Sequence, residues 1–399
     1  MVIRDWSKKK RKDKFNCSLN VADHILYVFG WQLRDNTVKP PLSCKINWPF
    51  MKQFTVRIIG SDSVFEVREG ESVLDAALRQ GIMLPYSCKN GTCGSCKCQI
   101  ESGDVHYPFH PPLALSRADI ADGQALLCQA EPTEDMVIHA REIAAVKDLQ
   151  IRKMPARVIE KTLLAHNVMR LVIKLPSAQR LQFLAGQYID ILLADGIRRA
   201  FSIASRPQRE DEIELHIRHV EGGGFTGWVF DELKEREILR IEGPLGTFFI
   251  RHDTEDRPMI LMGGGTGIAP LKSMIEDLIE HGSQRPLHLF WGVRTSDELY
   301  MRDQARQWAE EYSHIQFTSA LSEPAVGTET DSFEGFVHEA VLDQYPDLSP
   351  YDIYMSGPPI MIDNAREAFM AHAADKRRIF FDSFEFGLDV PVMVLARPH

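Results

Sequence analysis

The spacing of the cysteines constrains this chain more than any other feature of its sequence. Of seven cysteines, four fall within the eleven residues from Cys88 to Cys98, and Cys128 follows Cys96 after 31 intervening residues. A C-x4-C-x2-C triplet with one distal cysteine is typical of [2Fe–2S] clusters held by four thiolates. The spacing therefore predicts an iron–sulfur cluster with the ligands Cys88, Cys93, Cys96 and Cys128.

The composition of the loop fits this interpretation, and two alternatives fit less well. Gly91 and Gly94 supply the backbone freedom that three converging sulfurs need. A zinc site is the competing interpretation, but zinc ribbons usually show two C-x2-C pairs rather than a triplet and a lone thiol. Four unrelated thiols are the other alternative. Cys98 leads into an apparent strand, and we assign it to packing.

Cysteine usage and charge indicate the compartment and exclude some partners. An odd number of cysteines without dispersed pairs is a poor disulfide framework, so we expect a reducing, cytoplasmic location. Residues 1–50 hold ten Lys/Arg and four Asp/Glu, whereas the remaining residues hold 36 and 52. Such an acidic body argues against nucleic acid as a partner. No apolar run approaches the roughly 18 residues that span a bilayer, so we expect no stable membrane insertion.

The length predicts several domains. At 399 residues, the chain has room for two or three domains of roughly 150 residues each. Residues 1–50 include a basic run at 8–12, which suits either a targeting element or, more simply, a solvated tail. Met51 stands directly before the first clean strand pattern, at 54–59. We therefore expect residues 1–50 to be an extension outside the core fold, and even a mis-assigned start.

The middle third changes to short alternating strands, which are typical of a small antiparallel barrel. One helix is predicted in it, over 227–235. Within the tetrad Arg199-Ala200-Phe201-Ser202, Arg199 and Phe201 share one face of a strand because residues i and i+2 do so. A guanidinium suits a pyrophosphate, and an aromatic ring suits a flat heterocycle. Taken alone, such a pair is more often a surface charge and a core residue.

A glycine run opens the predicted helix of the barrel. Thr226 follows Gly222-Gly223-Gly224-Phe225 and is predicted to cap this helix. The exposed N–H groups and the dipole of a helix start favour a phosphate. The context of the tetrad therefore favours a nucleotide-like cofactor in this barrel.

The last third contains a second glycine-rich turn. A buried strand at 258–262 leads into Gly263-Gly264-Gly265-Thr266-Gly267 and then into a helix through Ile279, which together form a phosphate cradle. Ile268 occupies the place of the third glycine of G-x-G-x-x-G, which disfavours an ordinary Rossmann dehydrogenase. Two further segments support a nucleotide site: 289–294, expected after the second strand, and 354–361, at a later strand end.

The histidines carry no metal prediction. His106 and His110 have i, i+4 spacing, but the prolines around them oppose a helix. His216 and His219 would face opposite sides of a strand. The sequence contains no H-E-x-x-H, G-x-S-x-G or Walker motif, so hydrolytic and nucleoside-triphosphatase activities have no foundation in it.

These motifs resemble, in this order, those of a known multidomain family. Residues 54–140 resemble a plant-type ferredoxin domain, and the following segments resemble the flavin barrel and nicotinamide domain of the ferredoxin–NADP reductase superfamily. The whole resembles reductase components of phenol, toluene and methane monooxygenases. It resembles even more the CDP-6-deoxy-Δ3,4-glucoseen reductase family, through segments 87–97, 184–190 and 240–244.

The resemblance implies a multidomain fold: a β-grasp (α+β) [2Fe–2S] ferredoxin domain, an antiparallel β-barrel for FAD, and an α/β Rossmann-like NAD(P)-binding domain. The expected boundaries are an extension at 1–50, the ferredoxin domain at 52–143, a linker at 144–153, the FAD barrel at 154–253, the NAD(P) domain at 256–385 and a tail at 386–399.

The resemblance also implies roles for individual residues. Arg199 would bind the FAD pyrophosphate, Phe201 would pack on the isoalloxazine, and Ser202 would lie near N5. Phe201 replaces the Tyr of many members. Ser356 replaces a Cys that relatives commonly place near the nicotinamide. Because Ser202 and Ser356 would lie near the two reacting rings, they are the candidate catalytic residues. The cofactor-binding residues are Arg199, Phe201, Ser202, Gly224 and Thr226 for FAD, Gly264, Gly265, Thr266, Gly267, Gly357 and Pro358 for the nucleotide, and Phe384 in the aromatic-acidic segment.

The function implied is electron transfer from NAD(P)H through FAD and the cluster to a protein acceptor, either an oxygenase component or a deoxysugar dehydrase. Nicotinamide delivers two electrons as hydride, the cluster accepts one at a time, and a flavin joins the two processes. The alternative is a non-catalytic redox sensor or an electron-transfer subunit of a larger complex. Glu323, after the third strand of the last domain, would repel a 2′-phosphate and favours NADH over NADPH, although Arg294 nearby can compensate.

Overall fold

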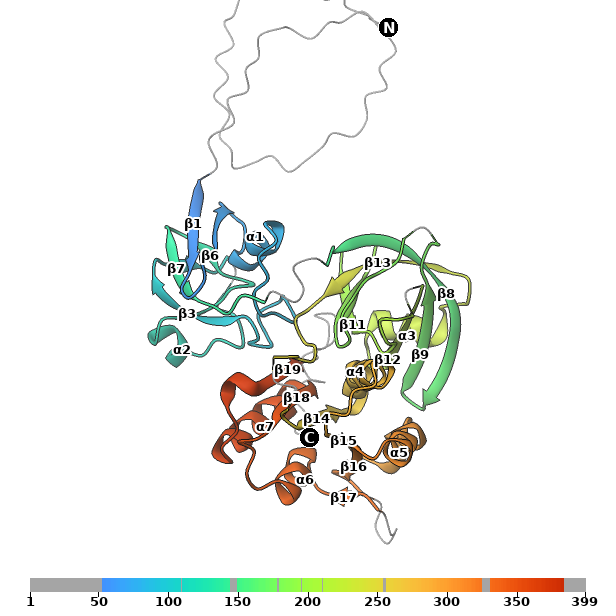
Figure 1. The fold of residues 1–399 in the computed structure, drawn as a ribbon. Coiled ribbons are helices and arrows are strands. Elements are labelled where there is room, and N and C mark those ends of the chain that lie inside the picture. Colours follow the sequence, from blue (N-terminus) through green and yellow to red (C-terminus); the bar gives the residue numbers. More distant parts are fainter. Residues whose placement is uncertain are drawn as a thin grey trace, which may run out of the picture. The chain divides into compact units, whose positions relative to one another are not determined.

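In the part of the chain that the structure describes, three sheets of five or six strands and one of two strands organise the fold (Figure 1). The computed structural model describes residues 52–108, 110–143, 149–177, 179–194, 196–209, 211–253, 256–324 and 331–383. Residues 1–51, the first half of the predicted linker, Phe384 and the predicted tail lie outside the described residues. Among the described residues, no helix is both long and apolar enough to cross a bilayer.

The first sheet has the order β2-β1-β7-β3-β5 and mixes parallel and antiparallel pairs. Its helix α1 begins where the Ser72 hydroxyl accepts a hydrogen bond from Asp75 N, and it buries Val73 and Leu74 against the sheet. This is the α+β architecture expected for a β-grasp domain. The bounds are β1 (Gln53–Ile58), β2 (Val64–Arg68), α1 (Val73–Arg79), β3 (Lys97–Ser102), β4 (Val105–His106), α2 (Arg117–Ala121), β5 (Gln124–Leu126), β6 (Glu131–Pro132) and β7 (Met136–His139).

The second sheet is an antiparallel barrel of order β11-β10-β13-β8-β9-β12. An isolated bridge between Ile203 and Leu215 joins its two edge strands, which closes the barrel around buried Ile, Leu and Val side chains. The bounds are β8 (Arg152–Ala165), β9 (Val168–Lys174), β10 (Tyr188–Leu192), β11 (Arg198–Ser202), β12 (Glu212–Arg218), α3 (Gly224–Asp231) and β13 (Ile238–Leu245).

The barrel helix corrects two predictions. Helix α3 runs over Gly224–Asp231 rather than 227–235, and its N-cap is Gly223, which has no side chain to cap it. Thr226 therefore lies in the first turn and is not the cap. Its Oγ1 accepts a hydrogen bond from Val220 N over 3.1 Å and so holds the preceding loop. The start of α3 was not predicted because glycines have a low helix propensity and contribute no apolar periodicity.

The third sheet is parallel throughout, with the order β17-β16-β15-β14-β18-β19. Helices α4 and α5 pack on one face and α6 and α7 on the other, as the two separate core clusters show. The bounds are β14 (Met259–Gly264), η2 (Gly265–Gly267), α4 (Ile268–Glu280), β15 (Leu287–Val293), η3 (Ser296–Glu298), α5 (Arg302–Glu311), β16 (Ile315–Leu321), β17 (Phe333–Glu334), α6 (Val337–Gln344), β18 (Asp352–Gly357), α7 (Pro359–Ala371), η4 (Lys376–Arg378) and β19 (Ile379–Ser383).

This doubly wound sheet confirms the α/β prediction and corrects one placement. Residues 289–293, expected after the second strand, lie within β15 itself, because the strand begins at Leu287. The strand order reverses beside β14, which pairs with β15 on one side and with β18 on the other. Ligands of open α/β sheets bind at this switch, outside the carboxyl ends of the strands. Gly263–Gly267 and Ser356–Pro358 lie at these ends.

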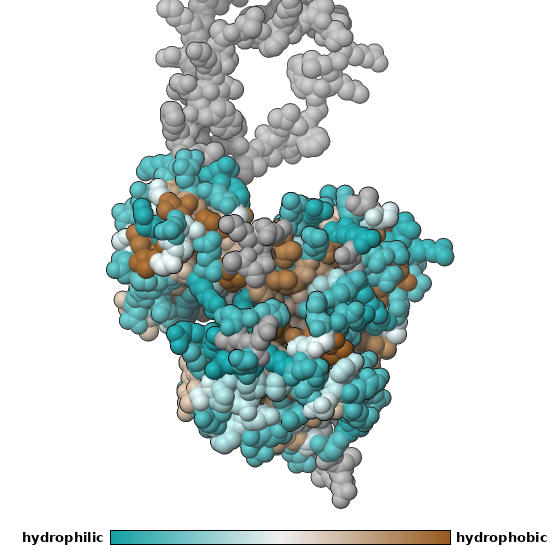
Figure 2. Space-filling view, viewed as in Figure 1, coloured by the Kyte–Doolittle hydropathy of each residue, from teal (hydrophilic) through white to brown (hydrophobic). Residues whose placement is uncertain are grey.

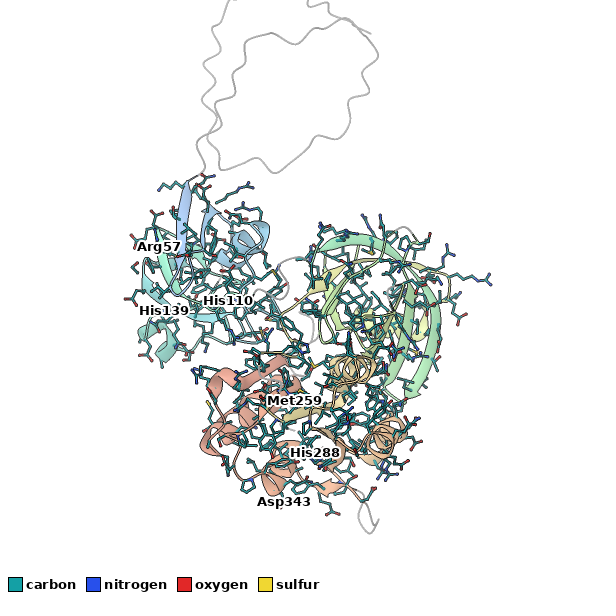
Figure 3. All side chains as sticks on the ribbon, viewed as in Figure 1. Arg57, His110, His139, Met259, His288 and Asp343 are labelled. Atoms are coloured by element: carbon teal, nitrogen blue, oxygen red, sulfur yellow. The ribbon has the colours of Figure 1, made fainter. Side chains whose placement is uncertain are left out.

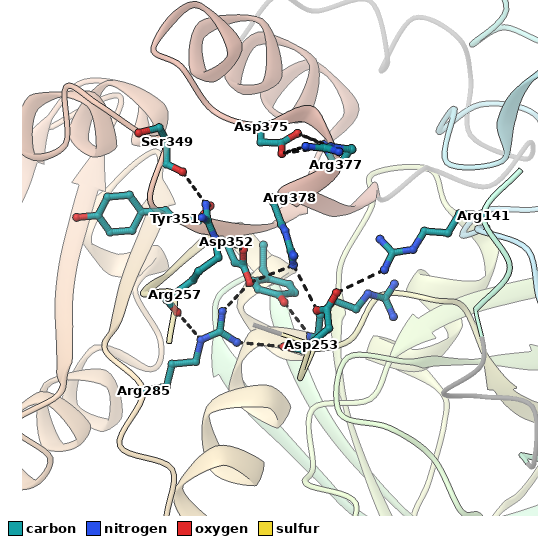
Figure 4. A network of polar contacts seen from close by, with 12 residues as sticks. Arg141, Asp253, Arg257, Arg285, Ser349, Tyr351, Asp352, Asp375, Arg377 and Arg378 are labelled. Carbon is teal, nitrogen blue, oxygen red and sulfur yellow. Dashed lines mark hydrogen bonds and ion pairs between the residues drawn. The ribbon is translucent and has the colours of Figure 1, made fainter. Parts of the chain in front are cut away.

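A buried polar network lies at the opposite, amino-terminal edge of the same sheet (Figure 4). Asp352, the first residue of β18, is fully buried and accepts from Arg257 Nε over 3.0 Å and from Arg285 over 2.6 Å. Arg257 precedes β14 and Arg285 precedes β15. One carboxylate therefore holds the starts of three adjacent strands together.

Several of the described histidines make local polar and stacking contacts. His106 lies in β4, and His139 bonds Glu101 over 3.0 Å on the first sheet (Figure 3). His288 stacks on Phe290 inside the parallel sheet, and its ring nitrogens bond two hydroxyls. Burial lowers the pKa of His288 to about 4. His219 lies beyond the end of β12, so the face argument does not apply to it.

The face drawn in Figure 2 is mostly hydrophilic over the parallel-sheet domain, whereas hydrophobic residues are visible on the β-grasp domain. Four large hydrophobic side chains of the β-grasp domain are well exposed: Ile59, Val64, Leu113 and Ile120.

Candidate functional site

The cysteine loop, residues 87–96, is shaped by close backbone packing. A Cβ added to Gly91 would lie 2.8 Å from Pro112 Cβ, and Gly91 has a φ of +86°, so only glycine fits there. Backbone N–H groups point at the sulfurs: Cys93 N donates to Cys88 Sγ and Ser95 N to Cys93 Sγ, each over 3.4 Å. Donors of this kind stabilise thiolates.

The four predicted ligands come together as two thiol pairs. A hydrogen bond from Cys93, assisted by one from Thr92, lowers the pKa of Cys88 to about 5. A hydrogen bond from Cys128 likewise lowers the pKa of Cys96. Within the described ranges, no three His, Cys, Asp or Glu side chains form a single-ion site. Cys128 also interacts with Cys88 and Cys93, so the four thiols lie close together and fit the four-thiolate ligand set of a [2Fe–2S] cluster.

Cys98 stands apart from these pairs. It lies in β3 within the core of the first sheet, and burial raises the pKa of its thiol to about 12. A buried, protonated thiol behaves as a small apolar side chain. This placement agrees with its assignment to packing.

The flavin tetrad occupies β11, next to the start of α3. Arg199 and Phe201 alternate with their neighbours on one face of the strand. The Phe201 ring lies 5.5 Å from the ring of Phe225, the second residue of α3. The strand and the helix start with its exposed Gly224 are therefore neighbours. The residues present fit a dinucleotide whose anionic part meets Arg199 and the helix start.

Ser202 points away from that face and is buried. Its Oγ donates to Asp382 Oδ2 over 3.2 Å, and the other oxygen of Asp382 accepts from the Ser87 hydroxyl. Ser87 directly precedes Cys88. Burial raises the pKa of Asp382 to about 6. One carboxyl group thus joins the flavin strand to the cysteine loop.

Tyr188 makes a second connection between the same parts. Its hydroxyl donates to Ser87 O over 2.5 Å, and Tyr188 is the direct cross-strand neighbour of Ser202 in the β10–β11 pair. No individual role was predicted for Ser87, Tyr188 or Asp382. Two sequence features could have pointed to such a role. Ser87 directly precedes the predicted cluster ligand Cys88, and Asp382 lies within the aromatic-acidic segment.

The nucleotide loop divides into a packed part and an open part. A Cβ on Gly264 would lie 2.5 Å from Met361 Sδ, and one on Gly267 would lie 2.0 Å from Ser356 O. These two glycines therefore allow the β14 turn to pack on the end of β18. Gly265 and Thr266 are partly exposed, and Trp291 Nε1 donates to Gly265 O over 2.9 Å. The accessible amides of the turn are those of Gly265 and Thr266.

Ser356 lies at the end of β18, next to Gly357 and Pro358. Among the described residues it is fully buried and its hydroxyl has no hydrogen-bond partner. Buried hydroxyls are normally satisfied, so this one is available for a polar group of a bound ligand. The surroundings fit a nucleotide at the predicted place.

Arg218, at the end of β12, was not predicted as a site residue. Its Nη1 lies 3.2 Å from where a Cβ of Gly265 would stand. Glu298 lies 3.9 Å from Arg218 and 2.9 Å from Arg294, so it holds both guanidinium groups. Two arginines beside the open part of a glycine loop suit an anionic ligand. The contact joins two domains, so local sequence carries no signal for it.

Comparison with known protein families finds three matches along the chain. Residues 56–133 match the 2Fe-2S iron-sulfur cluster binding domain, 155–250 the oxidoreductase FAD-binding domain, and 261–367 the oxidoreductase NAD-binding domain. The cofactors are therefore a [2Fe–2S] cluster, FAD and a nicotinamide nucleotide.

Whole-chain relatives show the same arrangement. The chain is 37% identical over 329 residues to the CDP-6-deoxy-L-threo-D-glycero-4-hexulose-3-dehydrase reductase of Yersinia pestis, covering 82% of this chain and 98% of that protein. It is 38% identical to the phenol hydroxylase P5 protein of Acinetobacter pittii, covering 83% and 94%.

A solved structure of similar length supports this relationship. The Amycolatopsis cytochrome P450 reductase GcoB superposes with a TM-score of 0.68 at 33% identity, covering 83% of this chain and 98% of that one. The chain is thus an NAD(P)H oxidoreductase that uses FAD and a [2Fe–2S] cluster to pass electrons to a partner protein. It belongs to the family of reductases that join a ferredoxin domain to a ferredoxin–NADP reductase-type module, together with the hexulose dehydrase and phenol hydroxylase reductases.

Proposed function

We propose that this protein oxidises NADH and delivers single electrons to an oxygenase component or a deoxysugar dehydrase. The names of the relatives support these two acceptor classes. The observation that carries the proposal is that the cysteine loop, with its predicted cluster ligands, is hydrogen-bonded through Ser87 to β10, the neighbour of the strand that carries the flavin tetrad. When bound, FAD takes up a hydride and releases its electrons singly to the cluster.

The ligands that we propose for the cluster are Cys88, Cys93, Cys96 and Cys128. For FAD we propose Arg199 and the start of α3 at Gly224 for the pyrophosphate, Phe201 for the flavin ring, and Ser202 near the reacting edge. Thr226 contributes by fixing the loop before α3, since its hydroxyl is bonded to Val220. Phe384, also expected near the flavin, stays a prediction.

For NADH we propose the open amides of Gly265 and Thr266, with Arg218 and Arg294 as counter-charges. Gly264, Gly267, Gly357 and Pro358 shape this site by packing, and Ser356 offers its unpaired hydroxyl to the nicotinamide end. Glu323 N donates to Arg294 O over 2.8 Å, so the backbone of Glu323 lies beside that of Arg294, and we propose that the negative charge of Glu323 disfavours a 2′-phosphate. This arrangement supports NADH over NADPH.

We further propose a cytoplasmic location, because the thiols and the cluster need a reducing compartment. The domain boundaries proposed are those predicted from the sequence, with the ferredoxin domain at 52–143, the FAD barrel at 154–253 and the NAD domain at 256–385.

An anaerobic titration tests the proposal. The purified protein is analysed for iron, sulfide and FAD and then titrated with NADH while the visible spectrum is recorded. We expect two iron atoms, two sulfides and one FAD per chain, as four thiolates of this type hold a [2Fe–2S] cluster, and bleaching of both chromophores by NADH. A protein that binds iron and FAD but is not reduced by NADH would instead be a redox sensor.

A matched pair of cysteine variants tests the ligand set. Cys128→Ala should lose the iron and retain FAD, because one thiol pair is broken while the barrel is untouched. Cys98→Ala should retain both, since this thiol belongs to the core. Equal iron contents in the two variants would refute the proposed set.

A further inference from the structure

The segment Tyr86-Ser87, directly before the ligand Cys88, is hydrogen-bonded to both other domains. Tyr188 OH of the barrel donates to Ser87 O, and Ser87 Oγ donates to Asp382 of the parallel sheet. We propose that Ser87, Tyr188 and Asp382 are positioning residues, a latch that holds the cysteine loop on the flavin strands β10 and β11 and sets the rate of electron transfer from FAD to the cluster. The inference rests on the proposed function and assigns residues to its internal step.

The latch has two arms, which are the hydrogen bond from Tyr188 to Ser87 and the connection from Ser202 through Asp382 to Ser87. Both arms begin at residues that face each other across two neighbouring strands. Tyr188 and Ser202 are direct neighbours across the β10–β11 ladder. Tyr188 reaches Ser87 O, which is one peptide unit from Cys88, and Ser202 reaches Ser87 Oγ through Asp382. The two neighbouring strands β10 and β11 are therefore each connected by a short route to the residue before the first predicted cluster ligand.

Flanking contacts hold the segment in register. Tyr86 N donates to Thr247 Oγ1 over 3.0 Å, and Thr247 N donates back to Tyr86 O over 3.3 Å. Gly246, with a φ of +88°, leaves room for the Tyr188 ring, because an added Cβ would lie 2.8 Å from that ring. The cysteine loop is thus fixed from two sides of the barrel.

The burial of the Asp382 carboxyl group is energetically unfavourable. Its side chain is buried, and among the described ion pairs none involves it. Burying a carboxyl group without a cation is unfavourable unless hydrogen bonds compensate. It accepts hydrogen bonds from two hydroxyls of the other domains, those of Ser87 and Ser202. A group retained at such a cost, between the loops of two cofactors, indicates a functional role.

The step that the latch controls is a one-electron transfer. One electron leaves reduced FAD and enters the oxidised cluster, so FAD is oxidised by one electron and the cluster is reduced by one. NADH supplies both electrons of each cycle. The latch residues exchange no electrons and only fix the positions of the two groups. The rate of such a transfer falls as the two groups move apart, so a displaced cysteine loop slows it.

Two single-hydroxyl variants test the two arms separately. Ser87→Ala removes the bond to Asp382 and leaves the Ser202–Asp382 bond in place. Tyr188→Phe removes the bond to Ser87 O and retains the buried ring. The matched control is Tyr345→Phe, which removes the hydroxyl of a half-buried tyrosine bonded to His288 over 2.8 Å, in another part of the fold. Ser87→Thr restores a hydroxyl and serves as the rescue.

Anaerobic stopped-flow mixing with NADH resolves flavin bleaching from cluster bleaching. In each latch variant we expect cluster reduction to be slower by roughly tenfold or more, with flavin reduction within about twofold of the wild type. Amide hydrogen exchange is the readout independent of turnover. The amides of Tyr86 and Thr247 should exchange about tenfold faster in both latch variants, because a buried acceptor is left unsatisfied. Tyr345→Phe should change neither.

Unchanged cluster reduction in both latch variants would overturn the proposal, as would faster exchange without slower reduction. Should Ser87→Ala lose its cluster, Tyr188→Phe decides, because that residue lies outside the ferredoxin domain. Failure of the proposed function has a different signature: the wild type itself would lack iron or FAD, or NADH would not bleach its flavin.

Discussion

Replacing Asp352 with asparagine should destabilise the NAD domain strongly. The Asp352 side chain is fully buried, and the side chain of its partner Arg285 is only 5% exposed. In Asp352→Asn the guanidinium of Arg285 stays buried without its counter-charge. Removing one partner of a buried ion pair costs about 3–5 kcal/mol, because the remaining charge is uncompensated. Arg257 also loses its carboxylate partner at 3.0 Å.

The expected shift in melting temperature follows from the size of the domain. For a domain of this size, 1 kcal/mol corresponds to roughly 3–4 °C, so we expect Tm to fall by roughly 10–20 °C. The assay is thermal and urea unfolding followed by the fluorescence of Trp291 and Trp308, two tryptophans buried in the NAD domain. Absorbance of the cluster monitors the ferredoxin domain separately in the same experiment.

The matched control is Asp375→Asn. Asp375 pairs with Arg377 over 2.8 Å in the same region (Figure 4), but the Arg377 side chain is 85% exposed. Solvent screens such pairs, so we expect no measurable loss of stability. If the two variants unfold alike, burial does not decide the strength of these ion pairs, and the argument is wrong.

The other predictions concern the candidate site. Gly267→Ala should raise KM for NADH, because the added Cβ would lie 2.0 Å from Ser356 O. The control Gly227→Ala, whose Cβ would have no atom within 4 Å, should leave KM unchanged. Steady-state kinetics with NADH measure both values of KM. Ser356→Ala should retain its Tm, since its hydroxyl has no partner, but should show altered kcat with NADH; a lowered Tm would contradict this. Burial raises the pKa of Asp382 to about 6, above its unfolded value of about 4, so the folded state binds the proton more tightly. Relative to Asp382→Asn, the wild type should therefore lose stability as pH rises from about 4 to about 6 and should then stay level; a parallel pH dependence of urea unfolding in both proteins would refute the assignment.

Local patterns predicted much of the fold. The strand pattern at 54–59 corresponds to β1, Gln53–Ile58, and the buried strand expected at 258–262 corresponds to β14, Met259–Gly264. The glycine turn with the helix that follows β14 is also as expected. Each of these signals lies within a few consecutive residues, so a single sequence contains it whole. The helix start at Gly224 was missed because glycines give no periodic signal.

The contacts that organise the candidate site were not predictable in this way. Ser87 and Asp382 are separated by 295 positions, and neither belongs to a motif that names the other. Arg218 reaches Gly265 from a different domain. The burial that raises the pKa of Asp382 comes from the packing of three domains together.

The sequence by itself determined which chemistry this protein carries, because the thiolates, glycines and the flavin tetrad must stand at fixed short spacings to hold their ligands. Only the tertiary structure decided how these groups are joined. Ser87, Tyr188 and Asp382 are ordinary residues in their own segments, and they acquire a role from hydrogen bonds made when distant segments are packed out of water. The spacing of residues along the chain indicates which residues bind each cofactor. The contacts between the cofactor-binding segments form only when the chain folds.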